Sequence, residues 1–295
     1  MLKIKQRLIF REDNVILQKF CGFWRWDIKT FQKSDFLMSR GRYRVTESLL
    51  GKISGKLLIE IDVPIEVEVT FEARINANVK GARAYASAPG AIAYANVDGA
   101  EAHANAPGAK AHAIAIGAIA YADAPGAEAH ANEPGAIARA KAPGAEAHAN
   151  APGVKARAIA PGAIAYANVD GAEAHANAPG AKAHAIAPGA IAYADAPRAI
   201  AYAKARGAIA RAKAPGAEAH ANTIGAEAHA DADGTKAYAN APGAKVYANV
   251  DGTKAYANAW GAVAHANVKG AIAYAIAIGA EAHANVDGAL AVRLW

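Results

Sequence analysis

The sequence predicts an all-β fold: a two-sided β-solenoid with two nine-residue repeats in each coil, an alanine-only core and a small basic N-terminal capping region. Three observations predict it. Glycine occupies every ninth position from 81 to 288, with Arg198 as the one substitution, which makes 24 consecutive units. Alanine alternates with other residues inside each unit, and a proline or aspartate often precedes the glycine. A fixed short period of this kind is typical of repeat proteins whose units stack on their neighbours.

Residues 1–56 stand outside the repeat and are strongly basic. They hold 13 Lys and Arg against 5 Asp and Glu, a net charge of +8, whereas the whole chain has +6. Aromatic and basic residues are interleaved there, so we expect a compact basic cap or anchor, with a membrane-interface patch or a nucleic-acid patch as the alternatives. The residues of this patch are Trp24, Arg25, Trp26, Arg40, Arg42 and Arg44.

Residues 57–80 read LLIEIDVPIEVEVTFEARINANVK and alternate like the repeat, but Ile, Val and Phe take the apolar positions in place of Ala. We expect this segment to form the opening coils, in which the larger inward side chains widen the solenoid. The N-terminal region would then cover the open end and prevent edge-to-edge pairing of strands.

Residues 81–295 form the repeat domain. With glycine as position 1, the unit is Gly-Ala-x-Ala-y-Ala-z-(Ala/Val)-(Pro/Asp/Ile), as in GAIAYANVD at 90–98. Alanine favours helices, but an alternation that Pro-Gly or Asp-Gly interrupts at a regular interval indicates a short strand followed by a turn. Charged residues at x, such as Glu101 and Lys110, cannot be buried in a row, so alanine points inward and x, y and z point to solvent.

Two arguments give the length of a coil. One unit is too short to close a coil, and a coil of three units would leave a void inside an alanine lining, so two units close one coil. Residues 90–125 also match 162–197 with one change, Ile116 for Pro188, and the offset of eight units is a whole number of two-unit coils but not of three-unit coils. The last residues, ALAVRLW at 289–295, leave the consensus and indicate a C-terminal cap or a docking surface.

The nine-residue period and the two-sided coil are similar to those of the calcium-binding nonapeptide repeats of secreted bacterial toxins. Those repeats follow GGxGxD, whereas here alanine usually follows the glycine and no aspartate comes after a paired glycine, as in GAKAHAIAP at 180–188. The resemblance therefore extends to the coil and implies neither calcium binding nor secretion. Silk-like and insect ice-binding solenoids share the small inward residues but not this unit.

Position 5 carries a planar side chain in nearly every unit, since all ten histidines and ten of the eleven tyrosines stand there. Coils stacked about 4.8 Å apart would bring these planes together, so we expect a ladder of rings on each sheet and an amide ladder of asparagine at position 7. The ladders either stabilise the sheets or present a regular array to a ligand. The candidate ligand-presenting residues are Tyr94, His103, His112, Tyr121, His130, His148, Tyr166, His175, His184 and Tyr193.

A metal site is a sharper hypothesis for the same ladders. Residues two units apart are expected to be coil neighbours, which pairs His130 with His148 and Glu128 with Glu146. Two imidazoles and two carboxylates at this spacing suit a borderline divalent ion such as zinc, although histidines of a solvated ladder are the commoner case.

The histidine ladder also predicts sensitivity to acid. An unperturbed histidine titrates near a pH of about 6.5. Ten aligned histidines would then add charge to a repeat region that is close to neutral, with 19 basic and 21 acidic residues after residue 56.

The sequence disfavours several function classes. Cys21 is the one cysteine, so there is neither an internal disulfide nor a multi-cysteine metal site. Nothing interrupts the repeat to create a unique concave site, and we therefore expect no enzyme and no cofactor. We expect a structural or ligand-presenting scaffold. The alternatives are an ice- or glycan-binding protein that uses a flat face, and a membrane- or nucleic-acid-associated module that uses residues 1–56.

Partners and location are less constrained. The expected partners of the ladder faces are a second copy of the chain, or a repetitive surface or polymer. The N-terminal sequence lacks the apolar stretch of a cleavable signal peptide, and no apolar run is long enough to indicate a membrane span. The compartment stays open.

Overall fold

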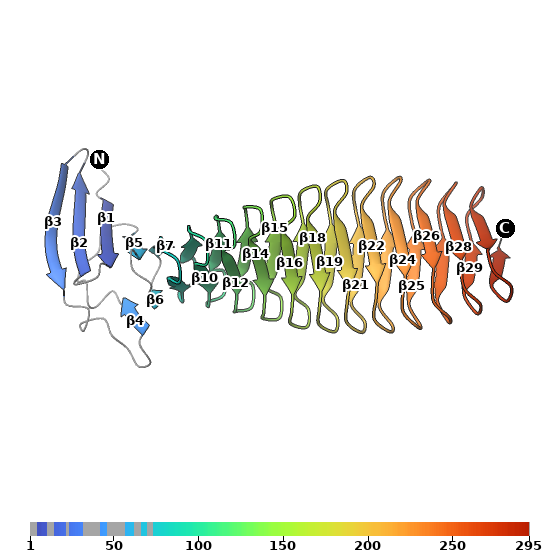
Figure 1. The fold of residues 1–295 in the computed structure, drawn as a ribbon, viewed down its shortest axis with the longest axis horizontal. Coiled ribbons are helices and arrows are strands. Elements are labelled where there is room, and N and C mark those ends of the chain that lie inside the picture. The colour runs from blue at the N-terminus through green and yellow to red at the C-terminus, as the bar shows by residue number, and fades with distance from the viewer. Residues whose placement is uncertain are drawn as a thin grey trace. The chain divides into compact units, whose positions relative to one another are not determined.

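The structure, a computed structural model, describes residues 5–10, 15–21, 24–31, 42–45, 57–61, 66–69 and 73–294. Every regular element in these ranges is a β-strand, and the described residues contain no helix that could span a membrane. Parallel strands stack about 18 residues apart in the sequence, so the predicted β-solenoid is confirmed (Figure 1). The chain divides into two compact units, Met1–Ala138 and Arg139–Trp295.

The strands before the repeat vary in length. They are β1 (Lys5–Phe10), β2 (Val15–Cys21), β3 (Trp24–Phe31), β4 (Arg42–Val45), β5 (Leu57–Ile61), β6 (Glu66–Val69) and β7 (Ala73–Ala77). Each repeat strand runs from position 3 to position 6 of its unit. These strands are β8 (Arg83–Ala86), β9 (Ile92–Ala95), β10 (Glu101–Ala104), β11 (Lys110–Ala113), β12 (Ile119–Ala122), β13 (Glu128–Ala131), β14 (Ile137–Ala140), β15 (Glu146–Ala149), β16 (Lys155–Ala158), β17 (Ile164–Ala167), β18 (Glu173–Ala176), β19 (Lys182–Ala185), β20 (Ile191–Ala194), β21 (Ile200–Ala203), β22 (Ile209–Ala212), β23 (Glu218–Ala221), β24 (Glu227–Ala230), β25 (Lys236–Ala239), β26 (Lys245–Ala248), β27 (Lys254–Ala257), β28 (Val263–Ala266), β29 (Ile272–Ala275), β30 (Glu281–Ala284) and β31 (Leu290–Arg293).

Strands that precede residue 57 continue both sheets of the first unit. β1 pairs antiparallel with β2, which pairs antiparallel with β3, and β1 also pairs in parallel with β5. On the other sheet β4 pairs in parallel with β6. Leu8 and Val45 from these strands are fully buried. The first coils of the solenoid therefore have a further strand beside them on each sheet.

The proposed basic patch falls only partly within the described residues. Trp24, Arg25 and Trp26 lie in β3, whereas Arg42 and Arg44 lie in β4. The side chains of these five residues, and the whole of Arg40, lie outside what the structure describes. The membrane and nucleic-acid hypotheses for this region therefore stay predictions.

The opening coils bury the larger side chains that the sequence places there. The side chains of Ile59, Ile61, Val67 and Ile75 are completely buried. The first of these coils is also shorter than those of the repeat, because Leu57 pairs with Ala73, a smaller separation than the two full units between Glu101 and its partner Ile119. A shorter coil is thus combined with bulkier inward side chains.

Each unit ends in a turn that needs a left-handed backbone at its glycine. In the turn 97–100, the Ala100 N–H donates to the Val97 carbonyl at 3.0 Å, and Gly99 has a φ of 69°. A hydrogen bond from the fourth residue to the first and a positive φ at the third are the signature of a type II turn, in which proline is common at the second. The Pro-Gly and Asp-Gly steps of the sequence are therefore the central residues of these turns.

Alanines at positions 2, 4 and 6 of the unit form the core between the two sheets. Ala100, Ala102 and Ala104 show the pattern, since all three are completely buried. Alanine supplies nearly all of this core, and the larger residues that take inward positions in the repeat are Val154, Thr235, Val246 and Thr253. The two threonines are satisfied locally: each hydroxyl donates to the carbonyl three residues before it, as Thr235 does to Ala232 at 2.6 Å.

The last coil is more exposed than the coils before it. β31 pairs in parallel with β29, and Leu290 at its start and Leu294 directly after it are 53% and 59% exposed. Both alternatives for residues 289–295, a cap and a docking surface, are compatible with this exposure and stay predictions.

Arg198 offers a direct test of the turn. It has a φ of 60°, the one positive value at a non-glycine residue in the described ranges. We expect Arg198→Gly to raise the free energy of unfolding by about 0.5–1 kcal/mol, because a left-handed residue with a Cβ is strained. Urea-induced unfolding followed by circular dichroism measures it.

The matched control introduces the same strain where it is absent. Gly180 has a φ of 71°, and a Cβ there would meet nothing within 4 Å. Gly180→Ala should therefore lower the free energy of unfolding by about 1 kcal/mol through backbone strain alone. An Arg198→Gly variant less stable than the wild type would contradict this account of the turn.

Candidate functional site

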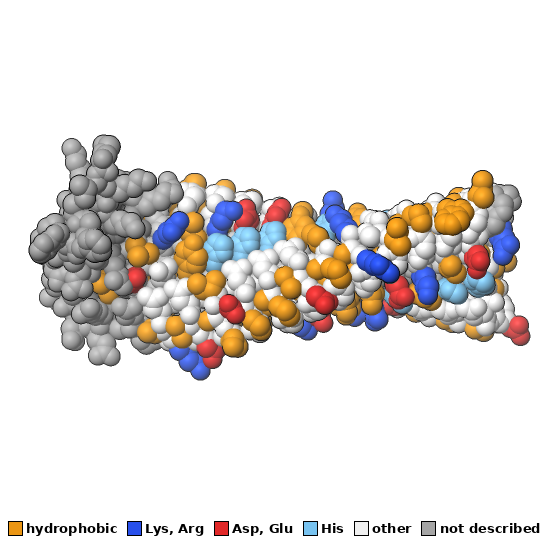
Figure 2. Space-filling view, turned by 90° about the horizontal axis from the view of Figure 1, so that it is seen from above, with side chains coloured by type: hydrophobic (Ala, Val, Ile, Leu, Met, Phe, Trp, Pro, Cys, Tyr) orange, Lys and Arg blue, Asp and Glu red, His pale blue; other side chains and the backbone are white. Residues whose placement is uncertain are grey.

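The planar side chains at position 5 form stacks along both sheets. Centroids of neighbouring rings lie between 4.4 Å, for Tyr85 and His103, and 5.1 Å, for Tyr202 and His220. The planes of stacked neighbours are nearly parallel, with angles from 6° to 23°. Histidines are visible as rows on the surface (Figure 2). The predicted ring ladders are therefore present in the structure.

All ten candidate ligand-presenting residues belong to such stacks. In the first unit, Tyr94, His112 and His130 stack on one sheet, and His103 lies between Tyr85 and Tyr121 on the other. In the second unit the stacked pairs are His148 with Tyr166, Tyr166 with His184, and His175 with Tyr193. The rings point outward, but stacking leaves His103, Tyr121 and His184 buried.

The ladder histidines share one pattern of polar partners. Where position 3 is glutamate, Nε2 lies 3.0–3.5 Å from its carboxylate. In several coils Nδ1 also faces the position 7 side chain of the next coil. His175 shows both: its Nε2 lies 3.1 Å from Glu173 Oε2 and its Nδ1 lies 2.8 Å from Asp195 Oδ2. His103 has the same partners in Glu101 at 3.3 Å and Asp123 at 2.9 Å. An imidazole between two carboxylates donates to both when it is protonated.

The position 7 partner was missed in the sequence, and the position 3 glutamate was noted beside His130 and His148 alone, as a metal ligand. The tetrapeptide Glu-Ala-His-Ala places the glutamate on the same outward face as the histidine. The second partner is the position 7 residue of the next coil, as Asp195 is for His175. It can be found once the coil length is known.

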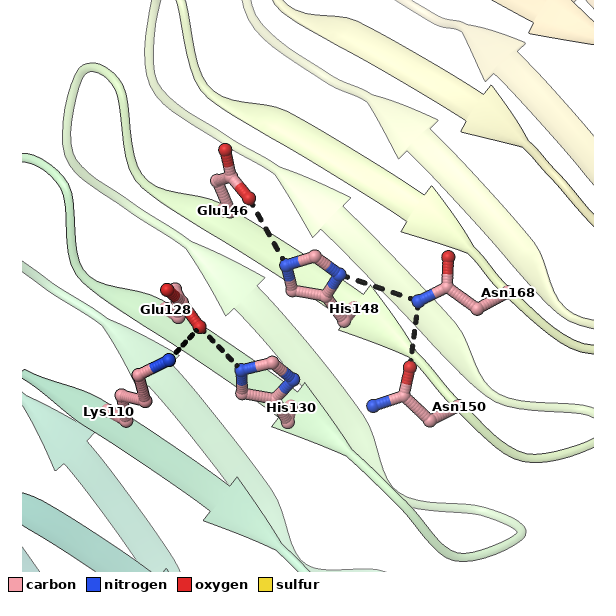
Figure 3. A network of polar contacts seen from close by, with 7 residues as sticks. All are labelled: Lys110, Glu128, His130, Glu146, His148, Asn150 and Asn168. Atoms are coloured by element: carbon pink, nitrogen blue, oxygen red, sulfur yellow. Dashed lines mark hydrogen bonds and ion pairs between the residues drawn. The ribbon is translucent and has the colours of Figure 1, made fainter.

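Figure 3 shows two polar networks of this kind, one in each unit. In the first unit Glu128 Oε2 accepts from Lys110 Nζ at 2.8 Å and lies 3.0 Å from His130 Nε2. Burial acts to raise the pKa of Glu128, but the hydrogen bonds from Lys110 and His130 outweigh it and hold the pKa below its ordinary value. The negative charge of this carboxylate is therefore already compensated by side chains of its own unit.

In the second unit His148 holds the equivalent position. Its Nε2 lies 3.3 Å from Glu146 Oε2, and its Nδ1 lies 3.4 Å from Asn168 Nδ2 (Figure 3). Asn168 Nδ2 also donates to Asn150 Oδ1 at 2.8 Å. The same amide contact recurs at other coils, for example from Asn96 to Asn78 at 2.8 Å, so the predicted asparagine ladder is confirmed.

The metal hypothesis gains no support from these networks. Within the described residues, no group of three or more His, Cys, Asp or Glu side chains is placed to hold a metal ion. The site proposed at His130, His148, Glu128 and Glu146 stays a prediction.

Stacking changes the expected titration of several ladder histidines. Burial, with the charges of His130 and Lys110, lowers the pKa of His112 to about 4. Burial, with the charges of Lys204 and Lys182, lowers the pKa of His184 to about 4. Burial also lowers the pKa values of His220, His229 and His265. The expected midpoint near 6.5 is therefore wrong for these residues, because their neighbours remove water from the rings.

Comparisons with known proteins add little to this geometry. No family model matches the chain, and no curated protein matches it. A solved structure of the A-module of mannuronan C-5 epimerase AlgE6 from Azotobacter vinelandii is similar over 85% of this chain and 89% of that chain, with 12% sequence identity and a TM-score of 0.27. A likeness of this size carries no inference about activity.

The lowered pKa values predict that acid destabilises the repeat. In the unfolded chain a histidine binds a proton near pH 6.5, but folded His112 and His184 bind one near pH 4. Between these values the unfolded state holds more protons, so stability is lost as the pH falls from about 6.5 to 5. Thermal unfolding should show a falling Tm over this range, by about 2–4 °C for each kcal/mol lost.

Replacing the two histidines isolates their contribution. The double variant His112→Gln, His184→Gln keeps planar side chains that do not titrate, so its Tm should depend less steeply on pH. If both proteins lose the same number of degrees between pH 6.5 and 5, these residues do not carry the effect.

Proposed function

We propose that this chain is a non-enzymatic scaffold whose repeat region has a structural role. The observation that carries the proposal is the stacking of the ladder rings. Tyr256 illustrates it: Tyr238 lies 5.0 Å from one face of its ring and Tyr274 lies 4.9 Å from the other. Sugars bind to the open faces of aromatic rings, and in these ladders the faces are covered by other rings.

Polar groups on the ladder faces are also largely engaged with one another. Position 3 side chains of adjacent coils form ion pairs, such as Arg83 with Glu101 at 3.0 Å and Lys155 with Glu173 at 3.0 Å. Asparagines donate to asparagines one coil away. Contacts of this type stabilise a sheet by about 0.2–1 kcal/mol per pair. The outward chemistry thus supports the solenoid itself.

An ice- or glycan-binding role is a weaker candidate. Such a role needs one chemical group repeated at a constant spacing on a flat face. Along one sheet of the second unit, position 3 holds Lys155, Glu173, Ile191, Ile209 and Glu227 in consecutive coils. A cation, an anion and an alkyl group in irregular order do not match a regular lattice.

The basic N-terminal region supports a different role, in which residues 1–56 bind a membrane or a nucleic acid and the repeat is a spacer. Its support is the charge of +8 and the interleaved aromatic residues. Vesicles with anionic headgroups and duplex DNA, tested against the full chain at increasing salt, distinguish the two ligands.

Exposed apolar side chains in the second unit favour a second copy of the chain as the partner. Trp260 and Ile278, one coil apart at position 9, are 70% and 77% exposed. The Trp260 indole lies so close over Gly279 that a Cβ there would be 2.8 Å from its Nε1. Leu290 and Leu294 are also exposed, in the last coil. Exposed apolar side chains gathered in this way are typical of protein–protein contacts.

Removing one ring from the ladder tests whether the ladder is structural or binds a ligand. Tyr256→Ala uncovers the ring faces of Tyr238 and Tyr274, and we expect it to lower the free energy of unfolding by about 0.5–2 kcal/mol. Neither protein should be retained by insoluble cellulose or chitin, or inhibit ice recrystallisation. Tyr256→His, which keeps a ring at position 5, should lose less stability.

The opposite pattern would overturn the structural role. Retention of the wild type on a polysaccharide or inhibition of ice growth, with loss of that property in Tyr256→Ala but not in Tyr256→His, shows that the ladder binds a ligand.

Self-association is measured by sedimentation velocity over a wide range of concentrations. We expect the wild type to form a dimer or a larger assembly, and the double variant Trp260→Ser, Ile278→Ser to sediment as a monomer. Ile116→Ser is the control, because Ile116 is 67% exposed but lies in the first unit. A wild-type chain that stays monomeric throughout excludes this contact.

A further inference from the structure

His184 departs from the pattern of polar partners that the other ladder histidines follow. Its position 3 neighbour on β19 is Lys182, as His112 has Lys110, whereas seven of the ten ladder histidines have glutamate there. The position 7 residue of the next coil is Lys204, where the other histidines that have a next coil face asparagine or aspartate. Lysines thus replace both polar partners of the shared pattern.

The ring of His184 is held firmly between its neighbours. It stacks on Tyr166 at 5.1 Å and on Tyr202 at 4.9 Å, and the residue is 7% exposed. Its Nδ1 atom is buried and has no hydrogen-bond partner among the described residues. The Nζ atom of Lys204 lies 5.4 Å from the centroid of the Tyr202 ring. A buried polar atom without a hydrogen-bond partner lowers the stability of the folded state, so a bound group that accepts from this nitrogen would be stabilising.

No carboxylate faces this ring from the adjacent strands. The outward residues next to it are Ile164, Tyr166 and Asn168 along β17, and Ile200, Tyr202 and Lys204 along β21. Within the described part of the chain, neither Lys182 nor Lys204 makes an ion pair. The buried imidazole nitrogen and the two lysines at positions 3 and 7 beside it thus have no anion on the adjacent described strands.

The equivalent histidines show what such a frame accepts. Beside His103 and His175, the carboxylates of Asp123 and Asp195 lie 2.9 Å and 2.8 Å from Nδ1. Both aspartates stand at position 7 of the coil after their histidine, the relation that Lys204 has to His184. The ring position is the same in each case, but at His184 lysines stand where the two carboxylates stand beside His103 and His175.

We propose that Lys182, His184 and Lys204 form a binding site for an oxyanion, in which a phosphate, sulfate or carboxylate group takes the place that Asp123 and Asp195 hold beside the equivalent histidines. The imidazole donates its Nδ1 hydrogen to the anion, and the Lys204 ammonium group donates beside it. The charge of Lys182, on the Nε2 side of the ring, adds to the positive potential of the site. Charge-assisted hydrogen bonds of this kind are stronger than neutral ones. The site is independent of the structural role proposed for the ladders.

His112 shows why the site is specific to one coil. The sequence around it, GAKAHAIAI at 108–116, matches that around His184 except at its last residue. However, Glu128 accepts from Lys110 at 2.8 Å in the next coil, where Ile200 follows Lys182. The lysine at His112 already has its anion, so His112 is an internal control.

The experiment follows the imidazole NMR signals of the full chain, with the His184 signals assigned from His184→Gln. Sodium phosphate, sulfate and acetate are titrated separately at constant ionic strength against chloride. We expect a saturable shift of the His184 signals and an increase in its pKa, while the His112 signals shift much less. The anion that saturates the site identifies which oxyanion group it takes.

Three variants test the assignment. Lys204→Asn should weaken anion binding at least tenfold. Lys204→Asp supplies an internal carboxylate, and should abolish binding and raise the Tm by about 2–4 °C, as an added charge-assisted hydrogen bond would. Lys213→Asn is the matched control, since Lys213 also stands at position 7 but lies over the ring of Tyr193 on the other sheet, and it should bind like the wild type.

Two results would overturn the proposal. One is the absence of a saturable shift with all three anions. The other is an equal response in Lys204→Asn and the wild type, which would show a general effect of salt. Neither result bears on retention by polysaccharides or on the loss of stability in Tyr256→Ala. The proposed scaffold role and the proposed anion site are therefore tested independently.

Discussion

The constraint on which the repeat region depends is that two sheets close within two nine-residue units around small inward residues. Ala at positions 2, 4 and 6 meets it, and the left-handed glycine lets the chain reverse direction after a strand as short as Glu101–Ala104. The same constraint makes the core thin. One buried methyl group contributes about 0.8 kcal/mol, so a coil of alanines gains less from burial than the Ile and Val of the opening coils.

A uniform alanine core also cannot fix the register of the coils. A strand that slips past its neighbour by a whole unit still places alanine on alanine, so the inward face does not resist the slip. The outward residues do discriminate. Lys155 lies beside Glu173, and His175 lies between Glu173 and Asp195. In the proposed structural role, the ladders supply both the stabilisation and the register that the core lacks.

The fold could be predicted from the sequence because one physical rule, alternation interrupted by a turn, is repeated 24 times. The coil length followed from the offset between identical segments, and the stacking at position 5 followed from the coil length. The pKa values could not be predicted in this way. They depend on how deeply a ring such as His112 is covered by its two neighbours, and outward direction alone suggested free exposure to water. The threonines at inward positions are a further case, since their hydroxyls are satisfied by turn carbonyls that only the structure identifies.

Identical local sequences acquire different chemistry in such a fold. Residues 90–125 and 162–197 differ at one position, yet His112 has Glu128 near its lysine and His184 has Ile200. Both partners lie beyond the matching segments, one coil after the lysine that they accompany. In this solenoid the polar partners of an outward residue include residues one coil away. A local motif such as Lys-Ala-His-Ala therefore does not determine the environment of its histidine. The site at His184 arises in this way: the segment supplies the frame, and the following coil decides whether an anion is built into it or must come from outside.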